Sequence, residues 1–220
     1  MSPFLQWYRY FFFPFLVWIS TAALVTAFTE RNTLHLWFNA HHHAWADVFF
    51  RYLTYMGDGV FGAFIVLLAM VYRIRYGVVG LIGLAGSGML TQLLKRQVFF
   101  EIKRPSKVFE QIADLHFVEG VELHGNFSFP SGHATAAFSI FLLLAFIFRK
   151  PAWQLVCFSL ALLVAFSRVY ISQHFFEDIF AGSIIGTTVT SIAFFWLYPK
   201  TWGSKGLIEW IENRFRGEST

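Results

Sequence analysis

The stretch PAWQLVCFSLALLVAFSRVYISQHFFEDIFAGSIIGTTVTSIAFFWLY, residues 151–198, decides the fold. Its two apolar runs, 151–167 and 179–198, are separated by a short polar segment that contains Arg168, His174 and Asp178. Each run approaches the roughly 20 mainly apolar residues that a helix needs to cross the hydrocarbon core of a bilayer. The pattern predicts two membrane-spanning helices, with ionisable side chains gathered where the first ends and the second begins.

Four more apolar runs of similar length precede this stretch, so the sequence predicts six spans. Hydrophobic residues make up 56% of the chain and charged residues 14%, against about 25% charged in soluble domains. We therefore expect an all-α integral membrane protein with one membrane-embedded domain over residues 1–220. The four further spans are expected at 11–29, 53–72, 76–94 and 133–148.

Charge and cysteine content narrow the range of partners. The net charge is +4, but the basic residues are scattered between apolar runs and form no contiguous patch of the kind that binds nucleic acid. The bilayer and lipid headgroups are the expected partners, and nucleic acid is not. The single cysteine, Cys157, excludes an intramolecular disulfide, and the sequence leaves the oligomeric state open.

The orientation follows from the short loops. Arg73-Ile74-Arg75 and Arg149-Lys150 are short and basic, and such loops tend to stay in the cytoplasm. The loops 30–52, 95–132 and 168–178 then face outward. Within the first of these, residues 34–52 mix aromatic and polar side chains, which predicts an amphipathic segment on the outer surface.

Every polar cluster that could carry chemistry falls at the outer ends of the expected spans. In the last cluster, His174 and Asp178 are four residues apart and share a helix face, so the carboxylate can accept the Nδ1–H and leave Nε2 as a nucleophile. Arg168 lies six residues before His174, nearly opposite on a continuous helix. We therefore expect a turn between them that brings both into one pocket.

A second cluster, Pro130-Ser131-Gly132-His133, begins the fourth expected span. The unpaired N–H groups and positive dipole end of a helix start form an anion site. There Ser131 adds a hydroxyl, Gly132 permits close approach, and His133 can donate a proton to a leaving oxygen. A third cluster, at the exit of the third span, contains Lys95-Arg96 and Arg104-Pro105.

These clusters resemble the three signature motifs of the type 2 phosphatidic acid phosphatases, which share a superfamily with the vanadium haloperoxidases. The second motif stands as Pro130-Ser131-Gly132-His133, and the third as Ser167-Arg168, five residues, His174, three residues and Asp178. The resemblance implies that His174 is the nucleophile, His133 the general acid and Asp178 the carboxylate that orients the nucleophile. It implies phosphate ligands at Lys95, Arg104, Ser131, Gly132 and Arg168.

The first motif departs from the family pattern, because eight residues separate Lys95 from Arg104 where the family has six. Lys95 and Arg96 point about 100° apart on a helix, so one of the two is expected in the site. We assign Lys95, with a loop longer by two residues, and keep Arg96 as the alternative. His41-His42-His43 is interpreted as interfacial polar residues, because consecutive helical side chains diverge and chelate one ion poorly.

The resemblance implies a lipid phosphatase that acts through a phosphohistidine and needs no metal or organic cofactor. Its expected substrate is a phosphomonoester or pyrophosphate of an envelope lipid. Its expected location is a bacterial inner membrane, with the site facing the periplasm or the cell exterior. The sequence leaves the lipid open among undecaprenyl pyrophosphate, phosphatidylglycerophosphate, phosphatidic acid and a lipid A phosphate. Two alternatives are a lipid-dependent phosphotransferase using the same site and a non-enzymatic six-helix transporter.

Overall fold

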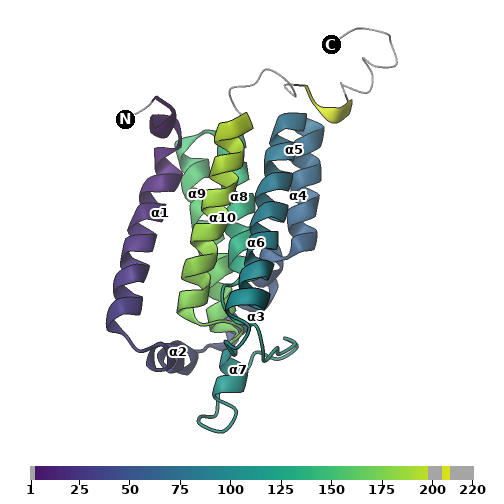
Figure 1. Ribbon diagram of the computed structural model, residues 1–220. Coiled ribbons are helices and arrows are strands. Elements are labelled where there is room, and N and C mark those ends of the chain that lie inside the picture. The colour runs from purple at the N-terminus through teal and green to yellow at the C-terminus, as the bar shows by residue number, and fades with distance from the viewer. Residues whose placement is uncertain (1–2, 198–204, 209–220) are drawn as a thin grey trace.

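The protein folds into a bundle of helices. The computed structural model describes residues 3–197 and 205–208, and every regular element in those two ranges is a helix. Figure 1 shows the long helices upright and side by side, with the short helices α2 (Arg31–Ala40) and α7 (Pro105–Val108) at one end, which we call the lower end. The prediction of an all-α protein is confirmed.

Within the residues that the structure describes, four helices are long and apolar enough to cross a membrane. A fifth candidate is a pair, α3 (Ala44–Leu53) with its following turn and α4 (Gly59–Tyr72), bent by 53° between its two halves. Helix α8 (Gly132–Phe148) is apolar but has 17 residues. The chain is therefore an integral membrane protein with four to five candidate spans, and the number six stays a prediction. The four long spans are Tyr8–Phe28 within α1 (Pro3–Phe28), Ile74–Val98, α9 (Pro151–Tyr170) and α10 (Phe176–Leu197).

The helix expected at 76–94 runs from Ile74 to Val98 and contains two π turns. It consists of α5 (Ile74–Leu81), the π turn η2 (Ile82–Gly86), α6 (Ser87–Leu93) and the π turn η3 (Leu94–Val98). π turns are rare and often mark functional sites. The second one contains Lys95, so the predicted phosphate ligand lies inside the helix.

The region where the second span is expected to start, at residue 53, contains a break between two helices. Helix α3 ends at Leu53, a 3-10 turn η1 (Thr54–Gly57) follows, and α4 begins at Gly59. Asp58 caps α4, with Oδ1 accepting a hydrogen bond from the N–H of Val60 at 3.2 Å. A carboxylate at this position satisfies an otherwise unpaired N–H group, so it favours a new helix start over a continuous span.

The last two spans meet closer together than the sequence predicts. Helix α9 continues to Tyr170, and α10 begins at Phe176, so Arg168 and Asp178 lie in terminal helical turns. The end expected at residue 198 lies outside the described residues. The segment expected to be amphipathic forms α2 and α3, which bury His35, Asn39, Ala46 and Phe50 and expose Trp37, Trp45 and Phe49.

Helix α8 is the centre of the bundle, between α9 and α10. It is apolar on all sides, as a helix buried by its neighbours must be, and its side chains from Ala137 to Leu143 are all buried. Aromatic rings fill the space at the upper end, where Phe146 stacks on Phe194 with ring centroids 3.9 Å apart. The N-terminus of α8 is held at the lower end.

Glycines of α10 let its backbone approach α8. A Cβ on Gly182 would lie 2.6 Å from the carbonyl oxygen of Ser131, and one on Gly186 would lie 2.2 Å from that of Thr135. Real Cβ atoms do not come so close to backbone oxygen. This contact places the first turn of α10 beside the start of α8, where the N–H of Ser131 donates to the carbonyl oxygen of Asp178 at 3.0 Å.

The close approach predicts a contrast between two glycine substitutions. Gly186→Ala should destabilise the protein, because overpacking typically costs roughly 1–3 kcal/mol. Gly88→Ala is the matched control: a Cβ there meets no atom within 4 Å, and alanine favours a helix by about 1 kcal/mol over glycine. Thermal denaturation in detergent should show a lower midpoint for Gly186→Ala and an unchanged or higher one for Gly88→Ala. Equal midpoints would contradict the packing described.

Candidate active site

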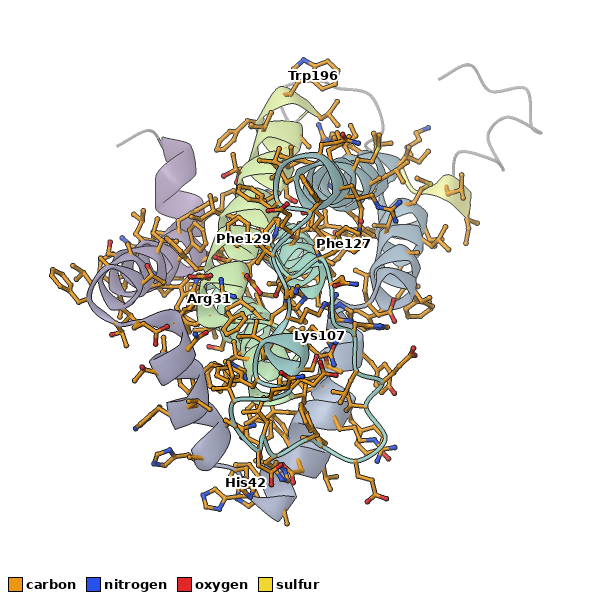
Figure 2. All side chains as sticks on the ribbon, turned by 60° about the horizontal axis from the view of Figure 1, so that its bottom comes forward. Arg31, His42, Lys107, Phe127, Phe129 and Trp196 are labelled. Carbon is orange, nitrogen blue, oxygen red and sulfur yellow. The ribbon has the colours of Figure 1, made fainter. Side chains whose placement is uncertain are left out.

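The eight predicted site residues lie in helices and connections that meet at the lower end of the bundle. Lys95 lies in η3, Arg104 just before α7, and Ser131 to His133 at the start of α8. Arg168 is in the last turn of α9, His174 in the connection to α10, and Asp178 in the first turn of α10. Figure 2 turns this end forward and shows the labelled Phe127 and Phe129, from the segment before α8, lying over it.

His174 and Asp178 form the buried pair that their spacing predicts. Nδ1 of His174 lies 3.0 Å from Oδ2 of Asp178, and the two side chains are 2% and 0% exposed. With the carboxylate ionised, Nδ1 carries the proton and Nε2 keeps its lone pair. The imidazole is therefore oriented as a nucleophile.

The same carboxylate oxygen is held from two further sides. Oδ2 of Asp178 also accepts hydrogen bonds from the N–H of Phe175 at 2.9 Å and from the hydroxyl of Ser128. Ser128 is fully buried, and its N–H donates to the carbonyl oxygen of Ile102. The sequence analysis missed Ser128, although it lies two residues before Pro130 and carries a hydroxyl in an aromatic segment.

The environment keeps His174 neutral. Burial is the largest cause, followed by the positive charges of Arg104, Lys95 and Arg168, and together they lower the pKa of His174 well below its ordinary value of 6.5. A group whose charged form is destabilised both by desolvation and by like charges stays uncharged at neutral pH. Nε2 is then unprotonated without help from a separate base.

Three cations surround the pair. The side chains of Lys95 and Arg168 are almost fully buried, and Arg104 is half-buried. Nη1 of Arg168 donates to the hydroxyl of Thr54 at 2.8 Å, which ties α9 to the turn before α4. Nε of Arg104 donates to the carbonyl oxygen of Asn126 at 3.0 Å. These hydrogen bonds hold the two guanidinium groups in place.

The structure separates the two candidates for the first basic position. Lys95 is 6% exposed and lies within electrostatic range of His174, whereas Arg96 is exposed. The π turn changes the helical phase directly after Lys95, where the N–H of Phe99 bonds to the carbonyl oxygen of Leu94 at 2.8 Å. This wider turn accommodates part of the additional length of chain between Lys95 and Arg104.

The start of α8 presents unpaired N–H groups, as the sequence predicts. Oγ of Ser131 caps the helix by accepting from the N–H of Ala134 at 3.4 Å, so the N–H groups of Gly132 and His133 have no helical partner. A Cβ on Gly132 would meet no atom within 4 Å. An anion that approaches these backbone N–H groups therefore has free space beside Gly132. The Ser131 hydroxyl also accepts the capping hydrogen bond of the helix.

A turn supported by α2 brings His174 round to Arg168. The N–H groups of Gln173 and His174 both donate to the carbonyl oxygen of Arg168, at 2.9 and 3.0 Å, which is the turn that the sequence predicts. Ser172 adopts a left-handed conformation, with φ 55°. Its hydroxyl accepts from Nδ2 of Asn39 at 3.1 Å, a support from α2 that the sequence analysis missed.

A cavity of about 470 Å³ opens beside the cations. Its wall includes Lys95 and Arg104 from the site and contains no acidic residue among the residues that line it. Its remaining lining residues are Gln92, Arg96, Leu123, His124, Gly125, Asn126 and Phe127. An anionic group larger than phosphate therefore has room next to Lys95 and Arg104.

The described residues contain no cluster of potential metal ligands. Within residues 3–197 and 205–208, no three histidine, cysteine or carboxylate side chains gather closely enough to hold an ion. His41 and His42 bond to backbone oxygens of their own helix, and His42 stacks on His116 with centroids 3.8 Å apart. The metal-free site remains a prediction.

Comparison with known proteins identifies the family. A family model described as PAP2 superfamily matches residues 76–202. Lipid A 4'-phosphatases from Bacteroides thetaiotaomicron and Porphyromonas gingivalis are 35% and 30% identical over 38% and 73% of this chain, and the alignments span 37% and 69% of those relatives. The crystal structure of Aquifex aeolicus LpxE, 26% identical, superposes with a TM-score of 0.66 and covers 76% of this chain and 95% of that one. Because the family match spans more than half of the sequence, this chain belongs to the PAP2 superfamily, as the motif resemblance predicts.

Proposed function

We propose that this protein is a lipid phosphatase that removes phosphate from a phosphomonoester or pyrophosphate of an envelope lipid. The observation that carries the proposal is the buried His174–Asp178 pair among Lys95, Arg104 and Arg168 at the end of an apolar bundle. A neutral imidazole between fixed cations suits attack on an anionic phosphate. Two relatives are lipid A 4'-phosphatases, which supports a lipid phosphate as substrate.

The substrate phosphate would be held by Lys95, Arg104 and Arg168, with the N–H of Gly132 and the hydroxyl of Ser131. The cations and the helix dipole are fixed before the substrate arrives, so they can stabilise the charge of the transition state without reorganising. The hydrocarbon chains of the lipid would remain in the bilayer beside the bundle. The cavity beside Arg104 offers room for the remainder of the headgroup.

In the first step, Nε2 of His174 attacks phosphorus in line with the leaving oxygen. The N–P bond forms as the P–O bond breaks, and His133, whose protonated form is favoured by the negative charge of the bound phosphate, gives its proton to the departing oxygen. Asp178 holds the Nδ1–H and balances the positive charge that develops on the imidazole. The product is a phosphohistidine and a dephosphorylated lipid.

In the second step, water replaces the lipid. His133, now unprotonated, takes a proton from the water, whose oxygen attacks phosphorus while the N–P bond breaks. Inorganic phosphate leaves, and both histidines return to their initial states. None of these steps requires a metal or an organic cofactor. A phosphotransferase would use the same pocket with a lipid or sugar hydroxyl in place of water, and isotope-labelled water distinguishes the two products.

We further propose six spans, an inner-membrane location and a site that faces the periplasm. The supporting observation is that the two short basic connections, Arg73 between α4 and α5 and Arg149-Lys150 between α8 and α9, lie at the upper end of Figure 1, opposite the site. Basic connections tend to remain cytoplasmic. The cations at the lower end depart from this bias because phosphate binding requires them.

The first test concerns the nucleophile. His174→Ala should lower phosphate release by roughly 10³-fold or more, and Asp178→Asn should lower it less, because the attacking nitrogen remains. His41→Ala, which removes an exposed histidine, is the matched control and should be fully active. Release is measured in EDTA on protein that elutes as a single species in detergent. Activity of His174→Ala within tenfold of wild type would refute the mechanism, and dependence on added metal would refute its metal-free form.

The second test concerns pH. Nucleophilic His174 must be unprotonated, and its lowered pKa means that protonation begins only at more acidic pH. The acidic limb of kcat/KM should therefore have its midpoint below pH 6.5 on a short-chain lipid phosphate. Returning samples to pH 7 should restore full activity, which separates titration from denaturation. A limb centred above pH 6.5 would show that His174 is not held neutral by its surroundings.

The third test concerns orientation in the membrane. Single cysteines at Glu119 and at Arg75, in a Cys157→Ser background, are exposed to a membrane-impermeant thiol reagent in intact cells. Glu119→Cys should react and Arg75→Cys should not, while both should react after permeabilisation. The reverse pattern would place the site in the cytoplasm and remove the argument for a periplasmic substrate.

A further inference from the structure

Gln173 occupies the centre of the cationic site without belonging to any of the predicted roles. Its side chain is 1% exposed and directly precedes His174 in the chain. Its Oε1 accepts a hydrogen bond from Nη1 of Arg104 at 2.8 Å and a longer one from Nη2 of Arg168 at 3.5 Å. One amide oxygen therefore lies between the two guanidinium groups proposed to bind phosphate.

The same amide group reaches the outer connection. Nε2 of Gln173 donates to the carbonyl oxygen of Glu122 at 3.0 Å, and Arg104 donates to the carbonyl oxygen of Asn126. The side chains of Gln173 and Arg104 thus both hold segment 122–126 by hydrogen bonds to its backbone. Part of this segment lines the cavity beside the site. Every polar atom of the Gln173 side chain is engaged.

A neutral acceptor has a specific advantage at this position. The half-buried guanidinium group of Arg104 and the buried one of Arg168 repel each other. Buried N–H groups without acceptors cost about 1–3 kcal/mol each. A carboxylate would satisfy them, but it would also bind them with strong charge-assisted hydrogen bonds and compete with the phosphate. An amide oxygen orients both cations and leaves their charge for the substrate.

We propose that Gln173 is a positioning residue that aligns Arg104 and Arg168 for phosphate and preserves their positive charge. The inference rests on the proposed phosphatase function for the identity of the anion. Gln173 acts through the two arginines and through its neighbour His174, and it makes no bond to phosphorus. The chemistry it serves is the binding of a tetrahedral or trigonal-bipyramidal oxyanion.

The test compares two substitutions of similar size by the affinity for vanadate, a phosphate mimic. Gln173→Glu keeps the acceptor and adds a negative charge, and Gln173→Met keeps the volume and removes the acceptor. Both should weaken vanadate binding and raise KM, by about tenfold or more, because each disturbs hydrogen bonds to charged groups. As the pH falls and its carboxyl group becomes neutral, Gln173→Glu should regain vanadate affinity relative to wild type. Gln173→Met should not regain it.

The chain offers a matched control in Gln154, another fully buried glutamine. It lies in the first turn of α9, far from the site along the helix, and its Nε2 donates to the carbonyl oxygen of Arg149. Gln154→Met should change thermal stability without changing vanadate affinity or the pH profile. Equal losses of vanadate affinity in Gln154→Met and Gln173→Met would overturn the positioning role.

The outcomes separate this inference from the phosphatase function. Wild-type vanadate affinity in Gln173→Glu, or in Gln173→Met if the Glu variant does not fold, overturns the role of Gln173 and leaves the nucleophile untouched. Full activity of His174→Ala overturns the phosphatase mechanism instead. Vanadate binding is measured at equilibrium on the monodisperse fraction of each variant, so a loss of folded protein does not register as a loss of affinity.

Discussion

The buried carboxylate of Asp178 is the constraint on which the rest of the site depends. Burying a carboxylate is costly unless hydrogen bonds compensate for its lost hydration, and here Oδ2 accepts from His174, Phe175 and Ser128. The buried Oδ1 has no hydrogen-bond partner among the described residues. The backbone of the same residue accepts from Ser131. The start of α8, the start of α10 and the connection before α8 are therefore fixed relative to one another by a single residue.

Three positively charged side chains lie around the single carboxylate of Asp178. Lys95 and Arg168 are almost fully buried in the protein, and a buried charge is costly unless it is paired or hydrogen-bonded. Neutral partners reduce this cost without cancelling the charge: Thr54 holds Arg168, the carbonyl of Asn126 holds Arg104, and Gln173 lies between them. An arrangement of this kind is stable yet remains positive, as the proposed binding of a phosphate group requires.

Support for the site also comes from outside the helical core. Helix α2 lies across the lower end, where Asn39 bonds to Ser172 and Arg31 pairs with Glu177 at 2.9 Å. Arg31 also covers the ring of Phe175, 3.9 Å from its centroid. The amphipathic segment thus braces the turn that contains the nucleophile, which explains why a short connection can hold His174 and its neighbours in a fully buried position.

The sequence by itself determined the helical membrane fold, the pairing of His174 with Asp178 and the turn after Arg168, because apolar run length and helical spacing are local properties of the chain. It did not determine that α4 begins after Asp58, that Lys95 rather than Arg96 is buried, or that Ser128, Thr54 and Gln173 hold the charged groups. Those features depend on which side chains meet across helices, and the glycine-mediated approach of α10 to α8 sets that geometry. Contacts between residues distant in sequence leave no periodic pattern in the sequence, so only the tertiary structure decided them.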